Sequence, residues 1–174
     1  MQFSIEDTIN FLIRTPSTLD AMLRGLPQDM LMQNEGPNTW SAYDVLGHLI
    51  HGEKTDWIPR MRIILSDLED KTFEPFDRFA QLNAPGDQPI GALLDEFRVL
   101  REQNVKILEE QALTAEQLQM QGVHPDFGAV CLKDLLATWA VHDWGHIAQI
   151  SRVLAKQYKQ EVGPWRQYLT ILGS

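Results

Sequence analysis

Apolar residues recur at intervals of three and four positions along most of the chain, which is the period of one face of an α-helix. Four long segments have this pattern, over residues 4–25, 41–68, 89–107 and 132–158. Pro16 should kink or break the first of these helices, and Pro59 should bend the second. No segment alternates strongly between apolar and polar residues, as a half-buried strand would. The pattern predicts an all-α protein, and four long helices with one long crossover predict a four-helix bundle.

Several predicted helix starts carry residues that cap helices. Ser4 stands three residues before Asp7, and Ser41 stands three residues before Asp44. This spacing is a weaker form of the Ser-x-x-Glu capping box, in which each side chain bonds a free backbone N–H. Thr114 can cap one short helical turn between the last two long segments.

Segments rich in proline, glycine and polar residues separate the helices, over residues 27–40, 71–88 and 122–128. We expect these segments to be loops. The connection at 71–88 is not a domain boundary, because too little chain lies on either side for two cores. We therefore predict one domain over residues 1–174. After the last long helix, a short final helix is expected to pack onto the bundle through Trp165, Tyr168 and Leu169.

The charge of the chain excludes several classes of function. Its 174 residues include 24 acidic and 15 basic residues, for a net charge of −9, and the basic residues form no cluster. Phosphate groups need a positive patch, so nucleic acids and anionic membranes are excluded as partners. No apolar run approaches the roughly 20 residues of a membrane span. The acidic first helix is unlike a signal peptide, and the single cysteine, Cys131, fits a reducing cytoplasm.

Two histidines stand four residues apart in the last long helix. His142 and His146 share one helical face, one turn apart, with an apolar stripe that includes Trp139 and Ile150. Two imidazoles in this arrangement can bind one divalent cation such as Zn²⁺. They can equally be two hydrogen-bonded core residues, because many helices carry such a pair by chance.

The histidine pair does not match the metalloprotease motif, and a metal site needs a third ligand. Asp143 follows His142 where that motif requires glutamate, and its short side chain is expected to point away from the apolar stripe. The other histidines are His48, His51 and His124. His48 lies at the flank of the apolar stripe of the second helix, so periodicity gives it no preference over His51.

Three further residues have both a structural and a functional interpretation. Glu53 projects inward, where it can orient a ligand imidazole or pair with Arg14 or Arg101; the structural pairing is favoured. Gly145 can leave room beside the site or allow close helix packing. Cys131 stands at a helix start, where its pKa could be lowered, but no Cys-His motif surrounds it. A small buried residue at a helix entry is the favoured interpretation.

Motifs spread over nearly the whole chain, from Thr15-Pro16 onward, together resemble a known family. They comprise Trp40-Ser41, Val45-Leu46-Gly47-His48-Leu49 with Glu53, Phe127-Gly128, Leu132-Lys133-Asp134-Leu135-Leu136, Trp139, His142-Asp143-x-x-His146-x-x-Gln149-Ile150 and Gly163-Pro164-Trp165. The combination is similar to the DinB/YfiT-like superfamily of bacterial metalloproteins, which is distinct from the DNA polymerase of the same name.

This resemblance implies an up-down-down-up four-helix bundle that is often a dimer. It also implies that His48, His142 and His146 bind one divalent metal ion, commonly zinc or nickel, which resolves the choice between His48 and His51. Cys131 stands where similar proteins more often carry threonine or serine. Members of the family include bacillithiol S-transferases and mycothiol-dependent enzymes, so a low-molecular-weight thiol is a candidate cosubstrate.

Three histidine ligands would leave a coordination position open, as in catalytic metal sites. The first hypothesis is a metal-dependent transferase that activates a low-molecular-weight thiol for attack on a small-molecule substrate. The alternatives are a metal-dependent hydrolase that uses bound water, and a non-catalytic metal-binding stress-response protein. No catalytic residue outside the three histidines can be assigned. A homodimer is expected, with Trp57 and Trp165 as candidate interface residues.

Overall fold

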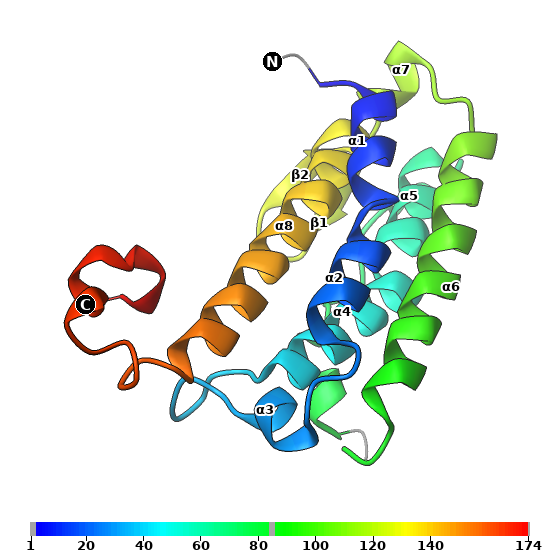
Figure 1. Cartoon of the computed structure of the whole chain (residues 1–174). Coiled ribbons are helices and arrows are strands. Elements are labelled where there is room, and N and C mark those ends of the chain that lie inside the picture. The colour runs from blue at the N-terminus through cyan, green and yellow to red at the C-terminus, as the bar shows by residue number, and fades with distance from the viewer. Residues whose placement is uncertain (1–2, 84–85, 174) are drawn as a thin grey trace.

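The computed structural model describes residues 3–83 and 86–173, most of which are helical. Its long helices are α1 (Ile5–Leu12), α2 (Thr15–Leu23), α4 (Ala42–Thr55), α5 (Trp57–Leu65), α6 (Ile90–Glu110) and α8 (Leu132–Lys156). Figure 1 shows α1 and α2 between α8 and α6, with α4 and α5 behind them. The short helices are α3 (Gln28–Met32) and α7 (Ala115–Leu118), with a 3₁₀ turn, η1, at Ala80–Asn83. None of the described helices is long and apolar enough to cross a membrane.

Two of the four predicted helices are broken into two. Pro16 stands in the first turn of α2, so the predicted break of the first helix is confirmed. The break in the second helix lies at Asp56 and not at Pro59. Proline has no N–H to donate to the carbonyl four residues earlier, which belongs to Thr55. The helix therefore ends at Thr55, and Pro59 falls in the first turn of α5, where no such bond is required.

The predicted capping residues start their helices. The Ser41 hydroxyl accepts a bond from the Asp44 N–H, and the Asp44 carboxylate accepts the Ser41 N–H at 2.9 Å. Thr114 forms the same reciprocal box with Gln117 at the start of α7. Ser4 accepts a bond from the backbone N–H of residue 7 at the start of α1.

A short β-hairpin replaces the loop that was expected over residues 122–128. Strands β1 (Gln121–His124) and β2 (Gly128–Cys131) pair antiparallel and lie against α5 and α8. The Phe73 N–H donates to the Val123 carbonyl and the Val123 N–H donates to the Lys71 carbonyl, both at 2.9 Å, so the connection after α5 lies beside β1. A side chain at Gly122 would lie 2.5 Å from the Phe73 ring, so the close approach requires glycine. Four-residue strands are too short for alternation to be visible in the sequence.

The end of the chain differs from the predicted short α-helix. It forms two 3₁₀ helices, η2 (Gly163–Tyr168) and η3 (Thr170–Leu172). Trp165 and Tyr168 were expected to pack onto the bundle, but they are 70% and 72% exposed. Leu172 is the buried residue of this segment, and η3 contacts α8.

A buried ion-pair network connects all four long helical segments. Arg101 of α6 is 1% exposed and lies 2.8 Å from Glu53 Oε1 of α4 and 2.5 Å from Asp143 Oδ2 of α8. It also donates to the carbonyl of Leu12, and the Thr15 hydroxyl donates to Asp143 at 2.6 Å. Burial alone would lower the pKa of Arg101, but the charges of Asp143 and Glu53 outweigh that effect and raise it.

Two more donors complete the network at Glu53. The Asn104 amide donates to its carboxylate at 3.1 Å, and the Trp139 indole N–H donates to it at 3.0 Å. The pairing of Glu53 with Arg101 confirms the structural interpretation of this glutamate. Trp57, a predicted interface residue, is instead buried and stacks on Trp139 with ring centroids 5.7 Å apart.

Arg101→Met should destabilise the protein by about 3–5 kcal/mol, because it leaves two carboxylates buried without their cation. Urea unfolding followed by circular dichroism measures this change in the free energy of unfolding. The matched control is Arg98→Met, since Arg98 is in the same helix but exposed. Equal stability of the two variants would show that the buried network contributes nothing.

Candidate metal centre

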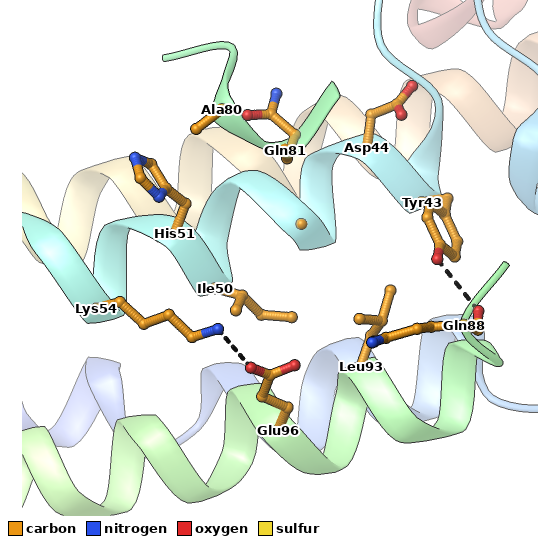
Figure 2. Close-up of a pocket in the computed structure, with 11 residues that line it drawn as sticks. Tyr43, Asp44, Ile50, His51, Lys54, Ala80, Gln81, Gln88, Leu93 and Glu96 are labelled. Carbon is orange, nitrogen blue, oxygen red and sulfur yellow. Dashed lines mark hydrogen bonds and ion pairs between the residues drawn. The ribbon is translucent and has the colours of Figure 1, made fainter. Parts of the chain in front are cut away.

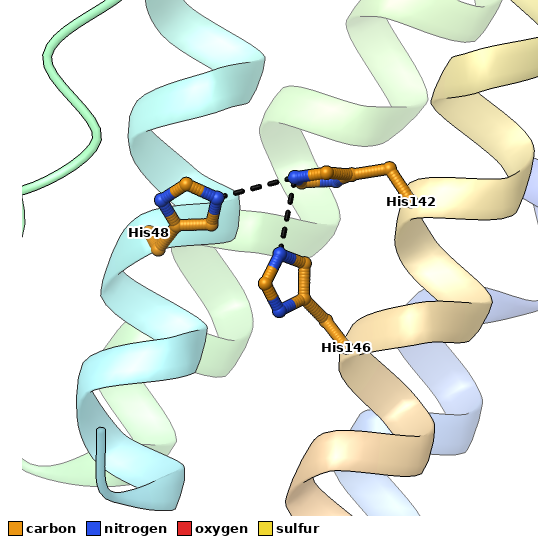
Figure 3. Close-up of side chains that lie close together, drawn as sticks. All are labelled: His48, His142 and His146. Carbon is orange, nitrogen blue, oxygen red and sulfur yellow. Dashed lines mark hydrogen bonds between the residues drawn. The ribbon is translucent and has the colours of Figure 1, made fainter. Parts of the chain in front are cut away.

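Three histidine rings converge between α4 and α8. Figure 3 shows His48 of α4 pointing toward His142 and His146 of α8. The Nε2 atom of His142 lies 3.1 Å from Nε2 of His48 and 3.1 Å from Nε2 of His146. The helix break at Asp56 does not disturb this arrangement, because His48 lies two turns earlier.

These distances fit a tetrahedral metal site. Zinc–nitrogen bonds of about 2.0–2.1 Å place neighbouring ligand nitrogens about 3.3 Å apart. The amide oxygen of Gln149 lies 2.8 Å from Nδ1 of His146, so this ring donates its N–H there and keeps the Nε2 lone pair free. Among the described residues, Nδ1 of His48 and of His142 have no hydrogen-bond partner of good geometry, although the backbone of Arg78 faces His48.

Burial keeps the three imidazoles neutral, as metal ligation requires. It lowers the pKa of His48 to about 4 and that of His142 to about 3, and the neighbouring histidines add to both effects. Burial also lowers the pKa of His146, while the hydrogen bond to Gln149 and the charge of Asp143 oppose this. All three rings are therefore uncharged at pH 7.

Aromatic side chains surround the histidines. Trp40 packs against His48 with centroids 4.8 Å apart and stacks over His146 at 6.2 Å. The edge of Trp57 meets His142 at 5.2 Å. These contacts pack the three rings in place.

A cavity of about 530 Å³ opens beside the three rings. Its walls come from α4, α5 and α8, from the connection that follows α5, and from the hairpin. Small molecules can therefore reach the position on which the histidine nitrogens converge.

The other two histidines lie away from this cluster. His51 is on another face of α4 and lines a separate cavity of about 280 Å³ between α4, η1 and α6, which Figure 2 shows. Lys54 and Glu96 form an ion pair of 2.6 Å at its edge. His124 belongs to β1 and lines the larger cavity without joining the cluster. The structure thus brings together the three histidines that the resemblance indicated.

Asp143 and Gly145 differ from their predicted roles. Asp143 does not point away from the buried face of α8; it is buried within it and bonds Arg101. His142 and His146 lie at the edge of this face, beside the cavity. Gly145 is exposed, and a side chain there would meet nothing within 4 Å. Neither room beside the site nor close helix packing explains this glycine.

Cys131 has a capping role and is half-buried, not fully buried as expected. Its Sγ donates to the Asp134 carboxylate at 2.9 Å, and its backbone N–H donates to the same group at 3.1 Å. Both bonds are donated by Cys131, and they belong to the capping box that Cys131 and Asp134 form at the start of α8. The cysteine therefore occupies the N-cap position of α8, where a threonine or serine is more usual.

Sequence reasoning assigned no role to two residues of the site. Gln149 was named only as part of a motif, although its spacing of three from His146 places it one turn away on the same face. Trp40 was also named only as part of a motif, before the capping residue Ser41. The partner of a histidine along one helix was detectable from spacing, whereas contacts across the bundle were not.

Comparison with known proteins places this geometry in a family. The family model described as the DinB superfamily matches residues 12–150. A similar solved structure is that of YfiT from Bacillus subtilis, described as a probable metal-dependent hydrolase with an unusual four-helix bundle topology. It shares 20% identity over 90% of each chain, with a TM-score of 0.75. The crystal structure of a DinB-like protein from Bacillus cereus is 19% identical over 90% of this chain and 94% of that one, with a TM-score of 0.62. The search of curated proteins found no match.

The metal-free protein should lose stability as the pH falls below 6.5. The folded-state pKa values of His48 and His142 lie below the ordinary value of 6.5, so protons bind the unfolded chain first. The histidine contribution is complete above pH 6.5 and is lost as the pH falls toward 3, by on the order of 3 kcal/mol for each of the two histidines. Urea unfolding of chelator-treated protein at several pH values measures it.

His142→Gln should flatten this pH dependence, because it removes one of the depressed groups. His51→Gln, which alters a histidine outside the cluster, should leave it unchanged. A stability that stays constant between pH 7 and pH 4 would contradict the neutral, buried histidine cluster.

Proposed function

Because the chain belongs to the DinB superfamily, we propose that His48, His142 and His146 bind one divalent metal ion, zinc or nickel. The single observation that carries this proposal is the convergence of three neutral Nε2 atoms beside an open cavity. We also propose the up-down-down-up order of the family for the four helical segments. The long connection between α5 and α6 supports that order.

We propose further that the protein is a metal-dependent transferase that uses a low-molecular-weight thiol against a small-molecule substrate. A bound divalent ion lowers the pKa of a thiol or water in its open position. Among the described residues, no carboxylate stands in the histidine cluster to take a proton from water. Asp134 is engaged with Cys131, and Asp56 with Arg60. A thiol has a pKa near 8.5 and loses its proton far more readily than water, which favours thiol chemistry here.

Metal-dependent hydrolysis of a small molecule is the second candidate. The similarity to the Bacillus subtilis protein described as a probable metal-dependent hydrolase favours it. The same three histidines would hold the ion in both cases. The two candidates differ in the nucleophile, so the test has to vary the thiol.

Purified protein should bind about one divalent ion per chain. His142→Ala should abolish binding, and His48→Ala should remove most of it, because each takes away one converging nitrogen. His51→Ala is the matched control from the same helix and should bind metal like the wild type. Elemental analysis and titration with Zn²⁺ or Ni²⁺ measure the stoichiometry. Loss of metal in the His51 variant alone would overturn the assignment.

Thiol transfer predicts that a thiol binds the metal directly. In Co²⁺-substituted protein, added thiol should produce a sulfur-to-metal charge-transfer band, and the rate with a model electrophile should require metal and thiol together. Hydrolysis of an ester or amide without any change in the cobalt spectrum would favour the hydrolase. No reaction in either assay, with a melting temperature that falls sharply after metal removal, would favour a non-catalytic metal-binding role.

We propose that the protein is a cytoplasmic homodimer. The family resemblance supports dimerisation, and the exposed rings of Trp165 and Tyr168, with centroids 6.4 Å apart, supply apolar surface for an interface. The single cysteine supports a reducing compartment.

Trp165→Ser combined with Tyr168→Ser should convert the dimer to a monomer, because both exposed rings are removed. Light scattering at micromolar concentration measures the mass. Val141→Ser, at an exposed position of α8, is the control and should remain dimeric. A wild-type protein with the mass of one chain would refute the dimer.

A further inference from the structure

The cavity beside the histidines has aromatic walls. The rings that line it are those of Trp40, Trp57, Phe73, Phe76 and Phe127. They come from the start of α4, from α5, from the connection after α5 and from the hairpin. Such walls favour a ligand with a flat, apolar body, since burial of ring surface is a large favourable term.

One wall also carries a buried guanidinium. Arg60 is 8% exposed and lines the cavity, with its guanidinium carbon 5.1 Å from the centre of the Phe73 ring. Its Nε lies 2.6 Å from Asp56 Oδ1, an ion-pair contact without hydrogen-bond geometry. Its Nη2 donates a long bond of 3.4 Å to the carbonyl of Glu74. Among the described residues, Nη1 has no hydrogen-bond acceptor, so this nitrogen of the guanidinium is available for a ligand.

A histidine adds a second donor to the same cavity. Nδ1 of His124 accepts the backbone N–H of Asp126 at 3.1 Å, so the neutral ring carries its proton on Nε2. The ring stacks on Phe127 with centroids 4.4 Å apart and meets the edge of Phe73. The cavity therefore combines a guanidinium and an imidazole N–H at one end with aromatic surface.

These donors lie away from the histidine cluster. Arg60 lies in α5, after the break that ends α4. Burial and the charge of Arg60 lower the pKa of His124, whereas other charged residues shift the pKa values of His48, His142 and His146. A group bound at Arg60 is therefore distinct from a group held at the three histidines. The cavity has two chemically different ends.

We propose that this cavity binds a small molecule with an aromatic or similarly flat apolar body and one carboxylate, which Arg60 and His124 bind. This inference rests on the proposed function in one respect, because the reacting end of the molecule would lie at the three histidines. A carboxylate matches the planar fork of the guanidinium. Asp56 and Asp126 stand close by, and their negative charges disfavour anions of higher charge such as phosphates.

NMR titration of ¹⁵N-labelled protein tests the proposal through the indole N–H signals of Trp40 and Trp57. The probes are 3-phenylpropanoate and its neutral amide, each titrated into metal-free and zinc-loaded protein. The acid should bind at least about tenfold more tightly than the amide in both forms, because a charged hydrogen bond is lost in the amide. This readout requires no catalytic activity.

Variants test the carboxylate-binding end of the cavity. Arg60→Lys should reduce the preference for the acid, and the double variant Asp56→Asn, Arg60→Met should abolish it without leaving an unpaired buried charge. Phe127→Ala should weaken the binding of both ligands, and of the acid more than the amide, because it removes apolar wall and also the ring on which His124 stacks. Phe127 is 77% exposed, so the fold should tolerate this change. Arg98→Met, an exposed arginine outside the cavity, is the control and should keep the full preference.

Each outcome decides one claim. A preference that exists only with zinc and survives the loss of Arg60 would mean that the acid binds the metal, which overturns the carboxylate subsite. Equal binding of acid and amide, or no shift of either indole signal, also overturns it. If the wild-type protein takes up no zinc but still prefers the acid, the carboxylate subsite is supported and the metal proposal is overturned.

Discussion

The contact between Arg101, Glu53 and Asp143 is the interaction on which the rest of the structure depends. A buried charge is stable only with well-placed partners, and a guanidinium presents its N–H groups in a fixed planar fork. The two carboxylates must therefore approach that fork from α4 and from α8 at set positions. Glu53 follows His48 by five residues in α4, and Asp143 is next to His142 in α8. The ion pairs that close the core thus also fix the separation of the histidines.

Charges of both signs lie around the histidine cluster. Two carboxylates and one guanidinium leave one net negative charge in a region closed to solvent. The three imidazoles are neutral at pH 7, because burial lowers their pKa values. The charge of Arg101 lowers the pKa of His142, and that of Arg78 lowers the pKa values of His48 and His146, while Asp143 opposes this at His146. A divalent ion at this position would therefore be held by its three nitrogen ligands and not by a net negative charge of the core.

Periodicity and capping predicted the long helices, because both are local properties of the chain. Periodicity predicted that His142 and His146 lie on the buried face of α8. The centre of that face instead lies near Trp139 and Asp143, and Asp143 is about 100° around the helix from His142. A carboxylate in the middle of an apolar face is explicable only when Arg101, from another helix, is known to face it. The third histidine posed the same difficulty, because the choice of His48 depends on packing between α4 and α8. The resemblance to a family supplied that information, and the sequence pattern alone did not.

Regular and irregular parts of the chain have separate roles in the site. The helices α4 and α8 position the histidines, whereas the connection after α5 and the hairpin supply much of the cavity wall. Backbone bonds of Val123 with Phe73 and Lys71 join these two irregular segments, so most of their side chains can change without loss of pairing. The three histidines therefore constrain the metal chemistry, but they carry little information about the substrate. That information lies in the residues of the wall, above all in Arg60 and His124, which line the cavity.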